Sequence, residues 1–273
     1  MAGNEERRRI SDERISKLLP IYYSGKYEST LQFLQEYGIA TSVFHGYLKR
    51  NGLKSLQHTT RKFEIDVDYF KNIDTEEKAY WLGFLQCDGY ITKTRMEIGL
   101  CYSDKEHIYK FLKETKSTYE PRKKIVANKY EAIRVDITSI EFLKPFVDIG
   151  IDKFTSINMK LLMTHDNPLF IHYIRGIIDA NGHMYIRDVS TGFGFCLQIS
   201  SGSIDFIKSL KRELELYCGH KNQVTIFKNN DGVNIRQICA KKILIDGYLK
   251  PKISLDRKQE KANAVLQRMC INL

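Results

Sequence analysis

Residues 79–91 read AYWLGFLQCDGYI, and residues 172–185 read HYIRGIIDANGHMY. Aligned on their glycines, the two segments are offset by 93 residues, and each has two glycines six residues apart. Both are apolar over a length typical of a buried helix. A fixed offset between two such segments indicates an internal duplication, so the rest of the chain is best interpreted as two copies of one unit.

The sequence that follows each segment is repeated as well. Residues 96–116 correspond to residues 193–214, and residues 132–150 correspond to residues 234–249, in each case as a strand followed by a helix. Apolar and charged residues alternate over residues 133–137, which is typical of a strand with one buried face. Each copy therefore reads αββαββα. The chain is expected to have an α+β fold with two similar subdomains related by a pseudo-twofold axis.

Glycine stands in the middle and at the end of each apolar segment. Gly83 and Gly176 disfavour a helix by about 1 kcal/mol relative to alanine, a cost usually offset where a second backbone approaches closely. We therefore expect the two helices to pack side by side at these glycines. Gly89 and Gly182 are expected to end the helices in the left-handed conformation. The residue before each terminal glycine would then lie at one shared end of the helix pair.

The two segments carry the same nine-residue motif. Residues 81–89, WLGFLQCDG, match the LAGLIDADG pattern in the apolar positions, both glycines and the penultimate aspartate, and residues 174–182, IRGIIDANG, match it again. The chain therefore resembles a single-chain LAGLIDADG homing endonuclease over about residues 70–265. The resemblance implies that the sheets of the two repeats form a saddle over the major groove of DNA, with the motif helices at its centre.

The resembled family has a carboxylate at the penultimate motif position, where it binds divalent cations beside the scissile phosphates. Asp88 matches this role, and Mg²⁺ or another divalent cation is the implied cofactor, since hard oxygen ligands suit Mg²⁺. Asn181 departs from the pattern, because its amide oxygen can contact a metal but adds no negative charge. Both residues are candidate metal ligands and catalytic residues. Asp179 lies about 200° around the helix from Asn181 and is expected to point elsewhere.

The family also places a basic residue near each scissile phosphate, in the loop after the last helix of each repeat. Lys153 and Lys252 are the candidates here, and Lys252 is preferred to Lys250 because it follows its helix as Lys153 does. Such a residue can activate water or stabilise the phosphate in the transition state. The alternative interpretation of these lysines is a solvated surface charge.

The chain divides into four parts by composition. Residues 1–62 are basic and helical in pattern, residues 63–78 are acidic and expected to form a linker, and residues 79–167 and 168–273 are the two repeats. Residues 11–54 predict three short helices, the last two separated by a glycine, and resemble the helix-turn-helix of resolvase-type or transposase-type modules. A small all-α bundle that only packs is the alternative.

Long polar side chains on hairpins can reach base edges in the major groove, although a solvated sheet face is the alternative. The residues expected to contact DNA are Ser42, His45, Lys49 and Arg50 in the N-terminal part, Arg95, Lys123, Lys124 and Arg134 in the first repeat, and Lys228 and Arg236 in the second.

Composition excludes several classes of protein. The 273-residue chain has 43 Lys and Arg against 33 Asp and Glu, a formal net charge of +10 that favours a polyanionic partner. Its apolar runs are too short to span a bilayer, and its first residues lack the apolar core of a secretory signal. Its six cysteines form no C-x-x-C pair, which argues against zinc ribbons and favours buried free thiols in a reducing compartment.

These observations predict a monomeric, site-specific endonuclease that hydrolyses double-stranded DNA within a target of about 20 base pairs. We expect a cytoplasmic protein that associates with the nucleoid, with no membrane partner. The alternatives are a strand-specific nickase and a DNA-binding regulator that has the same fold but does not cleave. Asn181 motivates both alternatives, because it replaces the second motif carboxylate.

Overall fold

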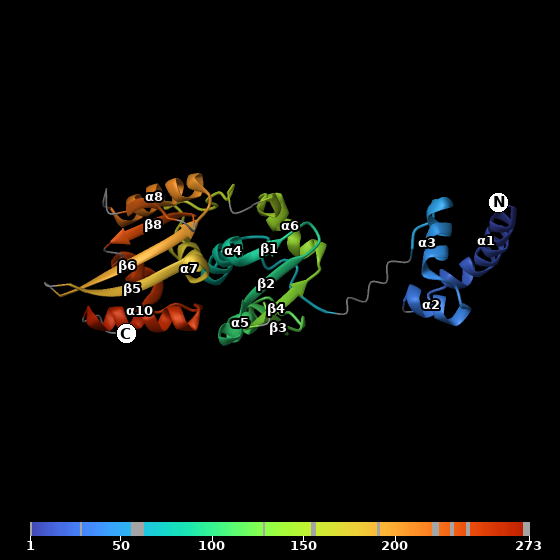
Figure 1. Cartoon of the computed structure of the whole chain (residues 1–273), viewed down its shortest axis with the longest axis horizontal. Helices are drawn as coiled ribbons and strands as arrows, with labels where there is room; N and C mark the ends of the chain where they lie inside the picture. Colours follow the sequence, from blue (N-terminus) through green and yellow to red (C-terminus); the bar gives the residue numbers. More distant parts are fainter. Residues whose placement is uncertain are drawn as a thin grey trace. The chain divides into compact units, whose positions relative to one another are not determined.

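The computed structural model describes residues 2–27, 29–55, 63–127, 129–153, 157–189, 192–219, 224–229, 232–238 and 241–269. The chain divides into two compact units, residues 1–62 and residues 63–273 (Figure 1). The second unit contains both repeats, which share one continuous apolar core.

The N-terminal unit consists of three helices, α1 (Ala2–Tyr22), α2 (Thr30–Tyr37) and α3 (Thr41–Arg50). Helix α1 begins nine residues earlier than the sequence suggests. The Ser29 side chain caps the start of α2, and Gly38 ends it in the left-handed conformation with a φ of +59°. Aromatic side chains form the core of this unit, with Phe33 and Phe44 fully buried against Tyr22.

Each repeat has the order αββαββα, which confirms the expected fold class. The first consists of α4 (Glu76–Asp88), β1 (Gly89–Ile91), β2 (Met96–Cys101), α5 (Lys105–Glu114), β3 (Arg122–Val126), β4 (Tyr130–Ile137) and α6 (Ile140–Asp148). Short 3₁₀ turns, η1 (Tyr102–Asp104) and η2 (Ile151–Lys153), follow β2 and α6. The second consists of α7 (Phe170–Asn181), β5 (Gly182–Val189), β6 (Gly192–Ser201), α8 (Ile204–Cys218), β7 (Val224–Asn229), β8 (Gly232–Ile238) and α9 (Lys241–Tyr248), and one more helix, α10 (Asp256–Arg268), follows it.

The two sheets have the same topology. The strand orders are β1-β2-β4-β3 and β5-β6-β8-β7, and every pairing is antiparallel. In the first sheet, Ile98 and Val135 are buried on one face, whereas Glu97 and Arg134 lie on the other, half-buried. One face of this sheet is therefore apolar and packed, and the opposite face carries polar and charged side chains.

Helices α4 and α7 cross at the two motif glycines, at the centre of the larger unit (Figure 1). A Cβ atom at Gly83 would lie 2.1 Å from the carbonyl oxygen of Tyr173, and one at Gly176 would lie 2.0 Å from the carbonyl oxygen of Tyr80. These distances are far below van der Waals contact, so no larger residue fits at either position without moving a backbone.

The terminal glycines of the motifs do not adopt the left-handed conformation, so this sequence expectation was wrong. Gly89 and Gly182 have φ values of −84° and −88°, which any residue can adopt. Glycine is needed there for space, because a Cβ atom would lie 2.4 Å from the carbonyl oxygen of Leu85 or of Ile178 respectively. The chain turns directly from each helix into a strand, and the last helical turn occupies the space that a side chain would need.

Residues 63–75 are not a linker, contrary to the sequence expectation. Ile65, Tyr69 and Phe70 are buried in the core of the larger unit. The backbone N–H of Asp66 also donates to the carbonyl of Thr115 at 2.8 Å. Apolar residues alternate with the acidic ones in this segment and turn inward, which a count of charges does not reveal. Among the described residues, no helix combines the length and apolar character that crossing a membrane requires.

Candidate active site and nucleic-acid interface

The last residues of α4 and α7, Asp88 and Asn181, lie at the same end of the helix crossing. Both are half-buried. A cavity of about 300 Å³ opens at this end, and its lining includes Gln86 and Gly89 from the first motif and Asn181 from the second. The C-terminal ends of the two motifs, which are 93 residues apart in the sequence, therefore lie together in the structure.

Asp88 is a carboxylate without a fixed partner. Burial raises the pKa of its carboxyl to about 6, and the nearby cations Arg257 and Lys258 oppose that rise. Within the described part of the chain, the carboxylate makes no hydrogen bond and no ion pair. Its oxygens are therefore available to a ligand that compensates for the loss of hydration, and a divalent cation has the charge to do so.

Lys258, on α10, lies at the same end of the helix pair. Its side chain is 3% exposed, and its Nζ donates a hydrogen bond to the carbonyl oxygen of Gly182. Burial lowers the pKa of this ammonium to about 8. No sequence pattern marks this residue, because α10 lies beyond the duplicated unit and has no motif of its own.

The start of α10 is tied to the first repeat, which fixes the position of Lys258. Asp256 pairs with Lys110 of α5 at 2.5 Å, and Arg257 pairs with Asp104 of η1 at 2.8 Å. Helix α10 therefore connects the two repeats next to the motif ends. Two salt bridges and a buried lysine hold one turn of a helix in a defined place.

Two tyrosines join the motif helices by reciprocal hydrogen bonds. Tyr80 of α4 donates to Asp179 of α7 at 2.7 Å, and Tyr173 of α7 donates to Gln86 of α4 at 2.5 Å. These pairs share the 93-residue offset of the motif glycines, so the pseudo-twofold relation extends to individual side chains. The offset itself could have identified them in the sequence.

Asp179 faces the core and not the cavity. Besides the bond from Tyr80, it accepts hydrogen bonds from the Tyr248 hydroxyl at 2.6 Å and the Leu255 backbone N–H at 2.7 Å. Burial raises the pKa of its carboxyl, while these donors oppose the rise. Asp179 therefore links α4, α7, α9 and the segment before α10.

Replacing Asp179 with leucine is expected to lower the free energy of unfolding by about 3 kcal/mol or more. Three buried donors would lose their acceptor, at a cost of about 1–3 kcal/mol each. Urea denaturation measures the change. Asn181→Leu, on the same helix and half-buried, is the matched control and should cost less than about 1 kcal/mol. A similar midpoint for both variants would show that the hydrogen bonds of Asp179 contribute little.

The two halves of the motif end differ in how they suit a metal ion. The described residues contain no group of three or more His, Cys, Asp or Glu side chains that could form a metal cage. Asp88 supplies one carboxylate, which suits an ion that keeps several water ligands, as Mg²⁺ does. On the other side, Asn181 supplies only a neutral amide, and the neighbouring carbonyl of Gly182 already accepts from Lys258. Asp152 lines the same cavity as Asn181, and among the described residues its buried Oδ1 has no hydrogen-bond partner. The residues therefore offer a divalent ion one carboxylate at Asp88 and another at Asp152.

The basic residues expected beside this site lie in two different places. Lys153 belongs to η2, and its neighbours Ile151 and Asp152 line the cavity, while its own side chain is outside the described residues. Lys252 was wrongly predicted: its Nζ lies 3.3 Å from Glu77, at the start of α4. Since α4 runs from Glu76 to Asp88 at 1.5 Å per residue, Lys252 is roughly 18 Å from the motif end. The gapped alignment after α9 misled the prediction, because the chain there turns back along the helix pair.

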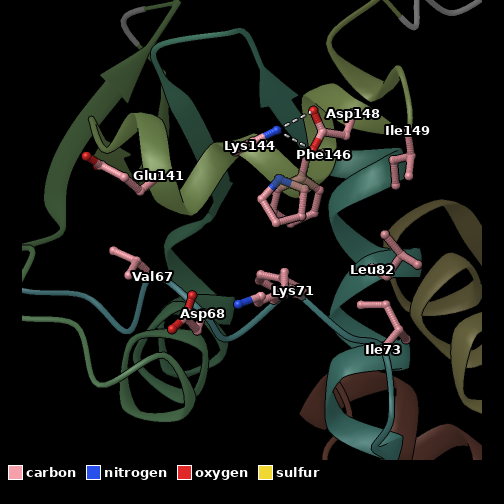
Figure 2. Close-up of a pocket in the computed structure, with 12 residues that line it drawn as sticks. Val67, Asp68, Lys71, Ile73, Leu82, Glu141, Lys144, Phe146, Asp148 and Ile149 are labelled. Atoms are coloured by element: carbon pink, nitrogen blue, oxygen red, sulfur yellow. Dashed lines mark hydrogen bonds and ion pairs between the residues drawn. The ribbon is translucent and has the colours of Figure 1, made fainter.

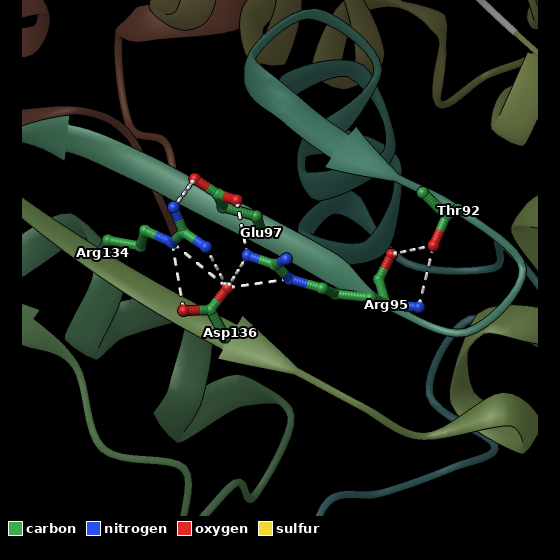
Figure 3. Close-up of polar contacts among 5 residues, drawn as sticks. All are labelled: Thr92, Arg95, Glu97, Arg134 and Asp136. Carbon is green, nitrogen blue, oxygen red and sulfur yellow. Dashed lines mark hydrogen bonds and ion pairs between the residues drawn. The ribbon is translucent and has the colours of Figure 1, made fainter.

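The polar face of the first sheet carries a network of ion pairs (Figure 3). Arg95 pairs with Glu97 at 2.9 Å and with Asp136 at 2.5 Å, and Arg134 pairs with the same two carboxylates at 2.6 and 2.7 Å. Glu97 and Asp136 stand directly opposite each other on β2 and β4. The two arginines thus separate like charges that would repel, and they are held in fixed orientations at the surface.

Asp136→Asn is expected to strengthen non-specific DNA binding and to steepen its salt dependence by about one unit in the log–log slope, if this face contacts DNA. The change frees the charge of two guanidinium groups for phosphates. Fluorescence anisotropy with a labelled duplex at several salt concentrations measures both quantities. Asp148→Asn is the control, because the ion pair that Asp148 makes within the described residues is with Lys144 on α6. An unchanged slope would show that this face does not meet phosphates.

The other predicted DNA contacts vary in availability. Lys123 pairs with Glu131 at 2.6 Å, whereas Lys124 and Lys228 are exposed. In the N-terminal unit Arg50 pairs with Asp12 at 2.7 Å. The exposed residues of α3 on one face are Ser42, His45 and Lys49. The side chain of Arg236 lies outside the described residues.

A larger cavity, about 540 Å³, lies elsewhere in the first repeat (Figure 2). It is lined mainly by apolar side chains of the segment before α4, of α4 itself and of α6, including Phe70, Leu82 and Phe146. None of the described residues at the motif ends lines it, so cavity size does not mark the candidate site here.

No protein-family model matches the chain, and no curated protein sequence matches it. The LAGLIDADG homing endonuclease I-GzeII, solved in complex with its DNA target, is 10% identical over 71% of this chain and 92% of its own, with a TM-score of 0.47. The homing endonuclease I-WcaI, bound to its DNA recognition sequence, is 14% identical over 70% and 90%, with a TM-score of 0.48. The N-terminal LAGLIDADG domain of DUF199/WhiA is 13% identical over 71% and 93%, with a TM-score of 0.43. The solved structures to which this chain is similar thus include LAGLIDADG homing endonucleases and the LAGLIDADG domain of WhiA.

Proposed function

We propose that this protein is a site-specific endonuclease that hydrolyses phosphodiester bonds in double-stranded DNA. One observation carries the proposal: two helices cross at Gly83 and Gly176, and the first of them ends at Asp88, a carboxylate with no hydrogen bond or ion pair among the described residues. The polar face of the first sheet adds ordered arginines that suit contacts with DNA. The excess of basic residues favours the same polyanionic partner.

The two repeats supply both halves of a DNA-binding surface in one chain, so a monomer is sufficient. Two pseudo-symmetric sheets would follow the major groove on either side of the cleavage point, over about 20 base pairs. The N-terminal unit would add contacts to one flank through the exposed face of α3. In that role, Ser42, His45 and Lys49 would face the groove, as the second helix does in helix-turn-helix modules.

Asp88 would hold the divalent ion, which supplies Lewis-acid polarisation of the phosphate and a more acidic water. Asp88 itself must be ionised to bind a cation, and a bound cation would offset the cost of burying that charge. Lys258 adds a second positive charge at the motif end, which favours a phosphate there. Because Asn181 is neutral, the two half-sites would cleave their DNA strands with unequal efficiency.

A plasmid assay tests the proposal. Supercoiled DNA that contains the native target is incubated with the protein and Mg²⁺, and nicked and linear forms are followed over time. We expect nicked circles to accumulate before linear DNA, because only one of the two motif helices ends in a carboxylate. Intact supercoiled DNA, together with tight binding to the same target, would contradict cleavage.

The second candidate function is DNA binding without cleavage. Asn181 and Lys258 favour it, since a neutral amide and an ammonium stand where metal ligands would be needed. The same assay separates the candidates, because a regulator would protect the target without nicking it.

Removing residues 1–62 is expected to shorten the protected DNA at one end by several base pairs and to weaken binding by 10-fold or more, about 1.4 kcal/mol. The N-terminal unit has a separate core, so the larger unit should keep its fold. DNase I footprinting measures the protected length, and circular dichroism checks the fold. A full-length footprint after the deletion would refute a role for the N-terminal unit in reading DNA.

A further inference from the structure

We propose that the end of the β3–β4 hairpin recognises thymine in the major groove of DNA through its C5 methyl group, with Val126 and Tyr130 as the contact residues. This inference rests on the proposed function, in which the first sheet faces DNA, and adds a base preference to it. It concerns an apolar pair of side chains, whereas the ion-paired arginines of the same sheet are charged.

The register of the sheet places this pair on the polar face. Side chains alternate between the two faces along a strand, so Tyr130, Ala132 and Arg134 of β4 project from the same side. Arg134 belongs to the ion-pair network of the polar face (Figure 3). Val126 of β3 stands directly opposite Tyr130, and residues opposite each other share a face. The pair therefore lies on the surface that the proposed function turns toward DNA.

The pair is apolar and exposed on an edge strand. Val126 is 51% exposed and Tyr130 is 60% exposed, and neither side chain belongs to the apolar core of the larger unit. Strand β3 is the last strand of its sheet. Proteins usually protect such an edge with charged side chains or cover it, because an exposed apolar edge strand promotes aggregation. A partner that covers these two side chains accounts for their place there.

The neighbouring residues identify that partner as DNA. In the next row of the same face, Cys101, Ala132 and Lys124 stand side by side on three adjacent strands, and Lys124 is exposed. The ammonium of Lys129 lies 5.3 Å from the centre of the Tyr130 ring. Lysines beside an apolar surface suit phosphates that lie beside base edges. The apolar group on the base edges of the major groove is the C5 methyl of thymine, which apolar side chains recognise by contact.

Duplexes that differ only in this methyl group test the inference. The probes are a short labelled duplex of mixed A·T pairs and the same duplex with every thymine replaced by uracil. Fluorescence anisotropy measures both affinities for the full chain at low salt, with EDTA to prevent cleavage. We expect the thymine duplex to bind about 4-fold more tightly or more, the factor for one methyl group removed from water. Equal affinities would overturn the inference and leave the proposed function standing, whereas no binding to either duplex would remove both.

Variants assign the preference to the two residues. The double variant Val126→Ser/Tyr130→Ser should bind both duplexes equally, with its affinity for the uracil duplex close to that of the wild type. Ile125→Ser is the matched control, because Ile125 is 69% exposed on the same strand but projects from the opposite face, and it should keep the full preference. All three positions are exposed, so circular dichroism should show an unchanged fold. A full preference in the double variant, or its loss in Ile125→Ser, would overturn the inference.

A methyl group on cytosine separates contact from DNA shape. A duplex of G·C pairs whose cytosines are 5-methylated presents the same methyl group in the major groove without any A·T pair. We expect the wild type to bind it more tightly than the unmethylated duplex, and the double variant to bind the two equally. No gain from methylation in the wild type would show that the hairpin does not contact the methyl group.

Discussion

Asp88→Asn is expected to reduce DNA cleavage by on the order of 10³-fold or more, about 4 kcal/mol in the barrier, while DNA affinity without metal stays near that of the wild type. Asp88 is the last residue of the first motif helix, and among the described residues it makes no hydrogen bond or ion pair of the kind that a structural role would require. End-labelled duplex, quenched at intervals, measures the rate on each strand. Cleavage at an unchanged rate would show that Asp88 is not a metal ligand.

The stability of the same variant provides the control for that experiment. The folded-state pKa of Asp88 is raised to about 6, above its unfolded value, because of burial. The unfolded chain therefore releases this proton at lower pH, and Asp88 disfavours the folded state increasingly as pH rises from about 4 to about 6, above which the cost stays constant. Without metal at pH 8, Asp88→Asn should unfold at a temperature equal to or higher than the wild type. A loss of cleavage in such a variant cannot then be attributed to unfolding.

Gly176→Ala is expected to lower the free energy of unfolding by more than about 3 kcal/mol, and Gly83→Ala should do the same. The added methyl group would lie 2.0 Å from the carbonyl oxygen of Tyr80 in the first case, and within 2.7 Å of the Phe84 backbone nitrogen. Both obstacles are backbone atoms of a buried helix, so a side-chain rotation cannot relieve them. The helices would have to separate along their whole length.

The sign of this effect makes the test sharp. Helix propensity alone predicts that alanine stabilises either position by about 1 kcal/mol. Gly99→Ala, in β2, is the control, because a Cβ atom there has open space around it. Urea denaturation of the three variants measures the differences. Stabilisation by Gly176→Ala would show that the helix crossing is looser than described.

The duplication could be predicted from the sequence because the same residue types recur at a fixed offset. These signals are local in the sequence. The motif glycines lie within an apolar helix, residues 133–137 alternate with the period of a strand, and the 93-residue offset records the copying of one unit. These predicted the αββαββα order of both repeats, which the structure confirms. The same offset relates Tyr80 to Tyr173 and Gln86 to Asp179. The hydrogen bonds from Tyr80 to Asp179 and from Tyr173 to Gln86 follow from this symmetry.

The tertiary structure alone decided what surrounds the motif ends. Lys258 reaches Gly182 from a helix outside the repeat, and Lys252 lies at the opposite end of α4, because the path of the chain after α9 has no local signature. The ion pairs of Arg95 depend on the register between β2 and β4, which residue types do not specify. Sequence patterns record which face of an element is buried, whereas the neighbours of a charged side chain depend on how separate elements pack. The motif carboxylate was therefore predictable, and the cations around it were not.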